Sequence, residues 1–66
     1  MQIILNGAVH ELAGEIRLAE LVRQVSNRKT GIAVAVNSAV IPRSCWADTA
    51  VNDGDRVDVV TAVQGG

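Results

Sequence analysis

The chain is poor in several residue types that mark particular classes of protein. Its 66 residues include one aromatic side chain, Trp46, and one cysteine, Cys45. A single cysteine rules out an internal disulfide and provides no ligand cluster for zinc. The core must therefore be built from valine, isoleucine, leucine and alanine, and a reducing compartment is compatible with the cysteine content.

The sequence also lacks an excess of charge and any long apolar run. Six Lys and Arg stand against seven Asp and Glu, and there is neither a basic run nor a set of aromatic residues for stacking on bases, so we expect no nucleic-acid binding. The N-terminus shows no charged segment followed by an apolar stretch and a cleavage site. No apolar run approaches the roughly 20 residues of a membrane span. We therefore expect no membrane contact and a cytoplasmic location.

The length of the chain limits what it does alone. Sixty-six residues suffice for one domain with one small core, and a domain of this size buries only roughly 60% of the surface exposed in the unfolded chain. We expect no second domain that could form a catalytic cleft. The prediction is that the protein is not itself an enzyme and acts together with partner proteins.

Residues 1–12 have the pattern of a β-hairpin. Two extended runs are separated by Asn6-Gly7, which supplies the two positive φ angles of a type I′ turn. An amphipathic helix is predicted next, roughly from Leu18 to Ser26, because apolar residues recur there at i, i+3, i+4 and i+7. Arg17 stands where a capping Ser, Thr, Asp or Asn is expected, so the first turn should be poorly capped.

The second half of the chain predicts further strands. Residues 32–36 alternate large residues with alanines, as in a strand that has a close neighbour over its small face. Residues 40–41 form a short edge segment, and pairing should stop about Pro42, which has no backbone N–H. The stretch 43–51 is expected to be a loop with room for one helical turn.

The last predicted strand follows a tight turn at residues 52–55. One face of this strand carries Val57, Val59, Thr61 and Val63, and the opposite face also carries Val60 and Ala62. Apolar residues on both faces favour a central strand. The order of elements predicts an α+β fold in which one helix packs across one face of a small mixed sheet, with the last strand beside the first. We expect the domain to span residues 1–63 and residues 64–66 to form a flexible tail.

This tail, Gln64-Gly65-Gly66, directly follows the predicted last strand. Glycine has no Cβ, so a Gly-Gly tail fits through a narrow channel that excludes larger residues. At average glycine usage a terminal Gly-Gly is expected in about one chain in 200. The pattern indicates a reactive end whose Gly66 carboxylate enters the active site of another protein. A frayed terminus without a role is the alternative.

A set of short motifs extends over essentially the whole chain: Asn6-Gly7, Glu20-Leu21-Val22, Asn37, Pro42-Arg43, Trp46, Asp53-Gly54-Asp55 and Gly65-Gly66. In their order and spacing these motifs resemble the ThiS family of sulfur carriers in thiamine biosynthesis. The resemblance implies a β-grasp, or ubiquitin-like, fold. At Arg17 the chain departs from the family, which commonly has a capping Thr there. The small sulfur-carrying subunit of molybdopterin synthase is the next resemblance, but it is usually longer and often has prolines before its Gly-Gly.

The resemblance implies that Gly66 carries sulfur on its carboxyl group. A carboxylate is an anion at neutral pH and resists nucleophiles, so it must first be activated. In the family a ThiF-type enzyme uses ATP and Mg²⁺ to form the Gly66 acyl-adenylate, and a cysteine-derived persulfide then supplies sulfur to make a thiocarboxylate. The thiazole synthase, ThiG, takes that sulfur into the thiazole ring. Gly65 would thread into the partner with Gly66, and the chain itself would bind no cofactor or metal.

Other candidate residues have simpler interpretations. Cys45 is expected to be a small packing residue, and His10 a strand residue without partners for metal binding. Asp53 and Asp55 fit turn chemistry better than a calcium loop. Trp46 is expected to cap the core. The exposed apolar faces of the sheet are then the better candidates for partner binding.

Two further classes of function stay open at this point. A ubiquitin-like modifier would form the same adenylate but end in an isopeptide bond to a lysine. A plain interaction module would use the sheet and have an inert tail. The sequence does not separate a carrier from a modifier.

Overall fold

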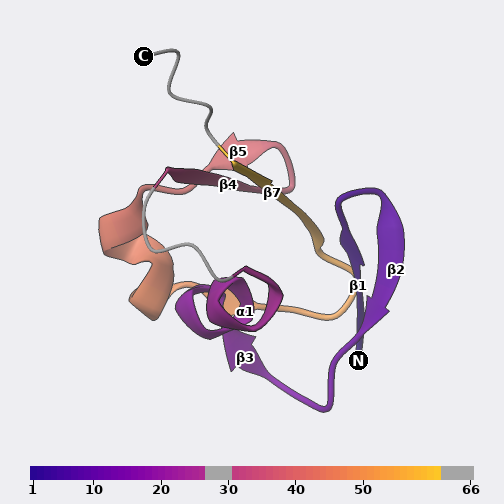
Figure 1. The fold of residues 1–66 in the computed structure, drawn as a ribbon. Coiled ribbons are helices and arrows are strands. Elements are labelled where there is room, and N and C mark those ends of the chain that lie inside the picture. Colours follow the sequence, from indigo (N-terminus) through magenta and orange to yellow (C-terminus); the bar gives the residue numbers. More distant parts are fainter. Residues whose placement is uncertain (27–30, 62–66) are drawn as a thin grey trace.

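A five-stranded mixed sheet carries the fold in the computed structural model, which describes residues 1–26 and 31–61. The strand order is β2-β1-β7-β4-β5, and a separate two-stranded ladder joins β3 to β6. The helix α1 lies across one face of the sheet (Figure 1). The predicted mixed sheet with one helix on one face is confirmed. The predicted tail, with Gly65 and Gly66, lies outside the described residues.

The N-terminal hairpin forms as predicted. Strands β1 (Gln2–Leu5) and β2 (Ala8–Glu11) pair antiparallel. Between them Asn6 and Gly7 have φ angles of 50° and 84°, as a type I′ turn requires. Asparagine and glycine tolerate this left-handed conformation better than other residues, so the turn fixes the register of the two strands.

The helix α1 (Leu18–Val25) directly follows the short strand β3 (Ile16–Arg17). Arg17 occupies the N-cap position and makes no side-chain capping hydrogen bond, which confirms the predicted weak cap. The Leu18 N–H instead donates to the Thr49 carbonyl at 2.8 Å. The start of the helix is therefore attached to the distant segment that precedes β6. Within residues 1–26 and 31–61, no helix has the length and apolar character needed to cross a bilayer.

The second half contains four strands and a 3₁₀ helix: β4 (Ile32–Val36), β5 (Ala39–Val40), η1 (Arg43–Asp48), β6 (Ala50–Val51) and β7 (Arg56–Thr61). The edge position of β5 and the end of pairing at Pro42 agree with the prediction. The predicted loop 43–51 was only partly right. It ends in β6, which pairs antiparallel with β3.

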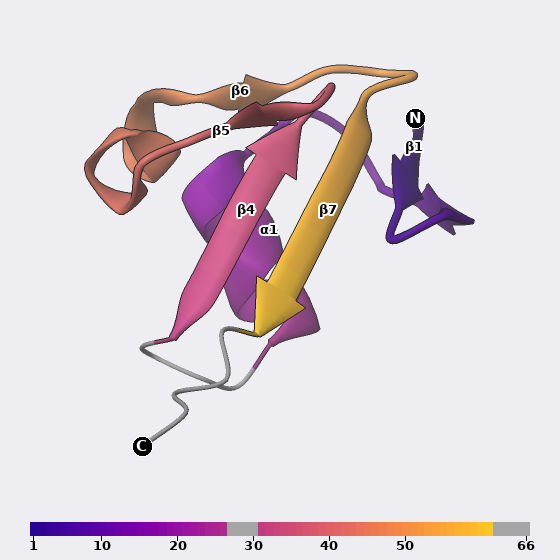
Figure 2. The same cartoon turned by 90° about the horizontal axis from the view of Figure 1, so that it is seen from above.

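The last strand lies in the centre of the sheet, as predicted. β7 pairs parallel with β1, where Leu5 is opposite Val57, and antiparallel with β4, where Val34 is opposite Val59. Figure 2 shows β4 and β7 side by side in opposite directions, with α1 behind them. A central strand has neighbours on both edges, so β7 is the strand that holds the two halves of the chain together.

The start of β7 is fixed by Asn37, in the turn between β4 and β5. Its φ is 51°. The Asn37 N–H donates to the Arg56 carbonyl at 2.7 Å, and the Asn37 Oδ1 accepts from the Arg56 N–H at 3.0 Å. The Nδ2 group donates to Asp55 Oδ1 at 3.1 Å. These bonds attach the first residue of β7 to the turn beside it.

The turn before β7 confirms the structural interpretation of its two aspartates. Asp53 Oδ1 accepts from the Gln2 N–H at 2.7 Å, and Asp55 Oδ2 accepts from the Asn52 N–H at 2.8 Å. Gly54 has a φ of 86°, and the Asp55 N–H donates to the Asn52 carbonyl at 3.0 Å. Both carboxylates therefore accept hydrogen bonds from the main chain.

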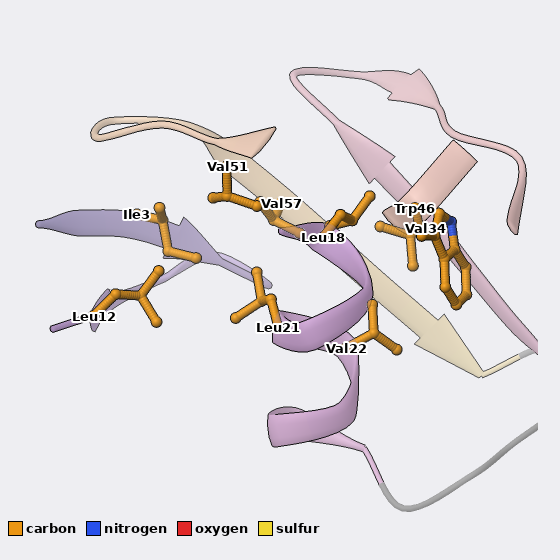
Figure 3. Packing of buried hydrophobic residues seen from close by; sticks show 9 residues of the cluster. All are labelled: Ile3, Leu12, Leu18, Leu21, Val22, Val34, Trp46, Val51 and Val57. Atoms are coloured by element: carbon orange, nitrogen blue, oxygen red, sulfur yellow. The ribbon is translucent and has the colours of Figure 1, made fainter. Parts of the chain in front are cut away.

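The core lies between the sheet and α1 (Figure 3). Its buried residues come from β1, α1, β4, η1, β6, β7 and the segment after β2: Ile3, Leu12, Leu18, Leu21, Val22, Val34, Trp46, Val51 and Val57. Trp46 is 6% exposed, and its Nε1–H donates to the Ile41 carbonyl at 2.9 Å, which confirms that it caps the core. The close neighbour expected over the alanine face of β4 was wrong, because Ala33 is exposed. That face belongs to the outer surface of the sheet.

Candidate functional site

The candidate site is the end of β7 together with the sheet surface around it. The sequence continues from Thr61, the last residue of β7, into residues 62–66, which include Gly65 and Gly66 and lie outside the described residues. The structure therefore places neither predicted tail residue. What it defines is the strand from which the tail continues and the surface beside that strand.

The end of β7 is fixed by Asn6, in the turn between β1 and β2. The Asn6 N–H donates to the Val57 carbonyl at 2.9 Å. The Asn6 Oδ1 accepts from the Val59 N–H at 2.7 Å. The ladder between β1 and β7 ends at Leu5 opposite Val57, so the asparagine side chain extends the contact beyond the last paired residue of β1.

The outer face of the sheet carries exposed valines. Val9, Val40 and Val60 are 63%, 75% and 55% exposed. Side chains alternate between the two faces of a strand, so Val60 points away from the core that Val57 enters. Figure 2 shows α1 on the far side of β4 and β7, so that within residues 1–26 and 31–61 no helix lies over the outer face of these two strands.

The strand register joins part of this apolar surface into a strip that reaches the end of β7. Val60 on β7 is opposite Ala33 on β4, and Ala35 on β4 is opposite Val40 on β5. These four residues lie on the outer face and define the outer strip. It begins one residue before the end of β7. Contiguous exposed apolar surface of this kind often marks a protein–protein contact.

An ion pair borders the outer strip on β7. Arg56 Nε lies 3.5 Å from Asp58 Oδ2, and the two side chains are 61% and 32% exposed. Exposed pairs of this kind contribute roughly 0–1 kcal/mol to stability. Arg56 and Asp58 are the two neighbours of Val57 on β7. Because Val57 points into the core, both lie on the outer face with Val60. The outer strip therefore has one polar edge, formed by an ion pair that contributes little to the stability of the fold.

Two other candidates from the sequence lie away from the end of β7. Cys45 is on η1 and exposed, so the expectation that it packs as a small core residue was wrong. The Arg43 guanidinium carbon lies over the Trp46 ring, 5.6 Å from its centroid, in a cation–π contact. His10 is half-buried on β2, opposite Ile3. Among the described residues no group of three or more His, Cys, Asp or Glu is arranged to hold a metal ion.

A hollow that was not predicted from the sequence lies between the start of α1 and the segment after β2. Its volume is about 340 Å³, and its lining consists of Glu11, Leu12, Ala13, Gly14, Glu15, Ile16, Glu20 and Gln24. In Figure 1 the segment between β2 and β3 lies at the opposite side of the molecule from the end of β7. The hollow is therefore separate from the candidate site.

Comparison with known proteins identifies the family. Residues 3–66 match the ThiS family. The chain is 35% identical to the sulfur carrier protein ThiS of Escherichia coli, over all 66 residues and the full length of both chains. It is also 29% identical to a thiazole synthase of Paramagnetospirillum magneticum, of which it covers only 20%.

The solved structures agree with the sequence comparison. The crystal structure of the thiamine biosynthesis protein ThiS from Geobacter metallireducens superimposes with a TM-score of 0.86 at 26% identity, covering the whole of both chains. A solution structure of a thiamine biosynthesis protein from the same organism gives a TM-score of 0.82, covering 88% of that chain. The predicted β-grasp fold is confirmed, and the family match favours ThiS over the molybdopterin synthase subunit. The chain belongs to the ThiS family, and it is a sulfur carrier protein of thiamine biosynthesis.

Proposed function

We propose that this chain carries sulfur as a thiocarboxylate on its C-terminal residue, Gly66, and donates it for formation of the thiazole ring. The observation that supports this most directly is that the family match runs through residue 66. It therefore includes Gly65 and Gly66, which follow the central strand of the sheet after a few residues. Gly66 bears the reacting carboxyl group, and Gly65 keeps the tail narrow enough to enter a partner's channel.

The first step is activation of the Gly66 carboxylate. A ThiF-type adenylating enzyme binds ATP and Mg²⁺, and the carboxylate oxygen attacks the α-phosphate, forming the acyl-adenylate and releasing pyrophosphate. The adenylate turns a poor electrophile into one with a good leaving group. In this scheme the chain is a co-substrate and not a catalyst, and both cofactors belong to the partner.

The second step replaces oxygen by sulfur. The terminal sulfur of a cysteine-derived persulfide attacks the activated carbonyl and displaces AMP, giving an acyl disulfide. A second thiol then attacks the donor's sulfur, forms a disulfide with it and leaves the thiocarboxylate on Gly66. The thiol pair supplies the two electrons that this cleavage requires. No nucleophile of this chain takes part.

A thiazole synthase of the ThiG type is the proposed acceptor of the sulfur. The similarity to a thiazole synthase supports this, because a segment like the present chain makes up about a fifth of that polypeptide. Joining two modules in one chain gives each a high effective concentration near the other. Such a fusion is useful when the two modules act in successive steps on the same sulfur atom.

The outer strip is the proposed docking surface for these partners. Residues 62–66 reach at most roughly 18 Å when fully extended, at about 3.6 Å per residue. A partner whose active site receives Gly66 must therefore contact the carrier close to the end of β7. Val60, which is 55% exposed, lies one residue before that end. Val60 is therefore close enough to the end of β7 to contact such a partner, and its side chain offers exposed apolar surface for that contact.

Intact mass measurement tests the proposed function. The chain would be incubated with ATP, Mg²⁺, a ThiF-type enzyme and a persulfide donor. We expect a product heavier by the difference between one sulfur and one oxygen atom, and an adenylate when the donor is left out. A lysine adduct would identify a protein modifier, and an unchanged mass would favour an interaction module with an inert tail.

A further inference from the structure

We propose that Asn6 is a positioning residue for the carrier reaction, because its side chain holds the end of β7 from which the tail continues. This inference rests on the proposed function, in which the Gly66 carboxylate enters a partner's active site. It concerns a side chain that is 60 residues away from Gly66 in the sequence and takes no part in the chemistry.

The geometry shows what the Asn6 side chain replaces. β1 ends at Leu5, whereas β7 continues from Val57 to Thr61. Beyond the end of β1, a backbone N–H on that side of β7 needs another acceptor. The Asn6 Oδ1 provides it and accepts from the Val59 N–H at 2.7 Å. The side-chain carbonyl therefore stands where the next residue of a longer β1 would offer its main-chain carbonyl.

The turn itself does not require this side chain. Asn6 has a φ of 50°, a conformation that glycine adopts at no steric cost. Glycine at position 6 would keep the turn and lose only the side-chain contact. The role of Oδ1 is therefore separable from the role of the residue in the hairpin, which makes the inference open to a clean test.

Asn37 is a matched control at the opposite end of the same strand. It too has a positive φ, and its Oδ1 also accepts a backbone N–H of β7, that of Arg56 at 3.0 Å. Arg56 is the first residue of β7, five residues before Thr61, whereas Val59 is two residues before it. The two asparagines thus make the same kind of bond, but only Asn6 makes it next to the tail.

The expected consequence concerns how tightly the carrier is bound before reaction. With both sides of β7 held, the strand end is ordered before the partner arrives. Without the Asn6 contact, part of that ordering must take place on binding, where it weakens the complex. The chemistry at Gly66 is unchanged once the tail is in place, so the effect should appear in KM and not in kcat.

The test compares three purified variants, Asn6→Gly, Asn6→Asp and Asn37→Gly, as substrates for adenylation at a temperature at which each is folded. We expect Asn6→Gly to raise the KM for the carrier about 3- to 10-fold at constant kcat, the range expected for one hydrogen bond. Asn6→Asp keeps an acceptor and tolerates a positive φ, so it should restore KM to near the wild-type value. Asn37→Gly should lose stability without a rise in KM.

Amide exchange provides a second readout. Exchange at the Val59 N–H, which donates to Asn6 Oδ1, should accelerate in Asn6→Gly relative to Asn37→Gly when both are compared at equal global stability. The inference would be overturned if KM rose equally in Asn6→Gly and Asn37→Gly, in proportion to the stability that each variant loses. An unchanged KM in Asn6→Gly would overturn it as well. Failure of the proposed function would look different, because the wild-type chain would then form no adenylate.

Discussion

The two faces of the sheet use the same residue type for opposite purposes. Val57 on β7 is 0% exposed and belongs to the core, whereas Val60, three residues later on the same strand, is 55% exposed. Val34 on β4 is 1% exposed, and Val40 on β5 is 75% exposed. The inner face is covered by α1 and the outer face is not (Figure 2). The difference separates the surface that folds the chain from the surface available to a partner.

The energetic meaning of this difference follows from burial. Covering a valine fully is worth roughly 1.5–3 kcal/mol relative to leaving it exposed. The valines of the inner face contribute that free energy to folding. The valines of the outer strip stay exposed in the folded chain, so their burial free energy does not stabilise the fold. A partner that covers them would gain this free energy on binding.

Changes at the C-terminal residue should abolish the reaction without affecting the stability of the fold. Removing Gly66, or adding one residue after it, displaces the reacting carboxylate by about one residue, roughly 3.5 Å. We expect adenylation to be abolished while the unfolding free energy stays at its wild-type value. The measurement is mass spectrometry of the adenylate, with chemical denaturation as the control. Adenylation of the extended chain would contradict the role given to Gly66.

A substitution on the helix side should affect folding. Leu21 on α1 is 0% exposed and packs in the core (Figure 3). Leu21→Ala should lower the unfolding free energy by about 2–5 kcal/mol, from lost burial and the cavity left behind. Urea denaturation measures this. Val60→Ala is the control on the outer face and should change stability by less than about 0.5 kcal/mol. Similar losses in the two variants would refute the division between the faces.

A charge on the outer strip should affect binding more than folding. Val60→Asp is expected to weaken binding to the adenylating enzyme about 10-fold or more, because a buried unpaired carboxylate is costly at an interface. Its stability should fall by less than about 1 kcal/mol, the span of strand propensities. Calorimetric titration gives the affinity. Val9→Asp, on the exposed strand β2, is the matched control and should weaken binding less.

The smallest effect is expected at the cysteine. Cys45→Ser should form thiocarboxylate at nearly the wild-type rate, because in the proposed mechanism sulfur exchange takes place on Gly66 and needs no internal thiol. The nearest cation in sequence, Arg43, lies over the Trp46 ring. The rate of thiocarboxylate formation is the quantity to measure. A large loss of rate at unchanged stability would assign the sulfur to Cys45 instead.

Much of the fold was predictable because its signals are local. Asn6-Gly7 specifies a tight hairpin turn, and the spacing of apolar residues in 18–25 specifies the helix. The pairing of β3 with β6 was missed, because strands of two residues are too short to show a period. Cys45 was misjudged since its exposure depends on how η1 packs, which no local pattern records.

The candidate site likewise has a part that local sequence predicts and a part that depends on the folded structure. The roles of Gly65 and Gly66 were predicted from the sequence and stay predictions, since both residues lie outside the described residues. The structure adds β7 and the surface around the end of that strand. The contact between Asn6 and Val59 was not predictable, since it joins residues 53 positions apart. It depends on the parallel pairing of β1 with β7 and on where that pairing ends. A residue whose turn role is obvious gave no sign of its second role.

The central claim is that sulfur is carried on Gly66, and locating that sulfur within the chain tests it most directly. The product of the reaction with ATP, the adenylating enzyme and a persulfide donor would be fragmented in the mass spectrometer. We expect the sulfur-for-oxygen increment only in fragments that contain Gly66, in the wild-type chain and in Cys45→Ser alike. An increment in fragments that contain Cys45 but not Gly66 would contradict it.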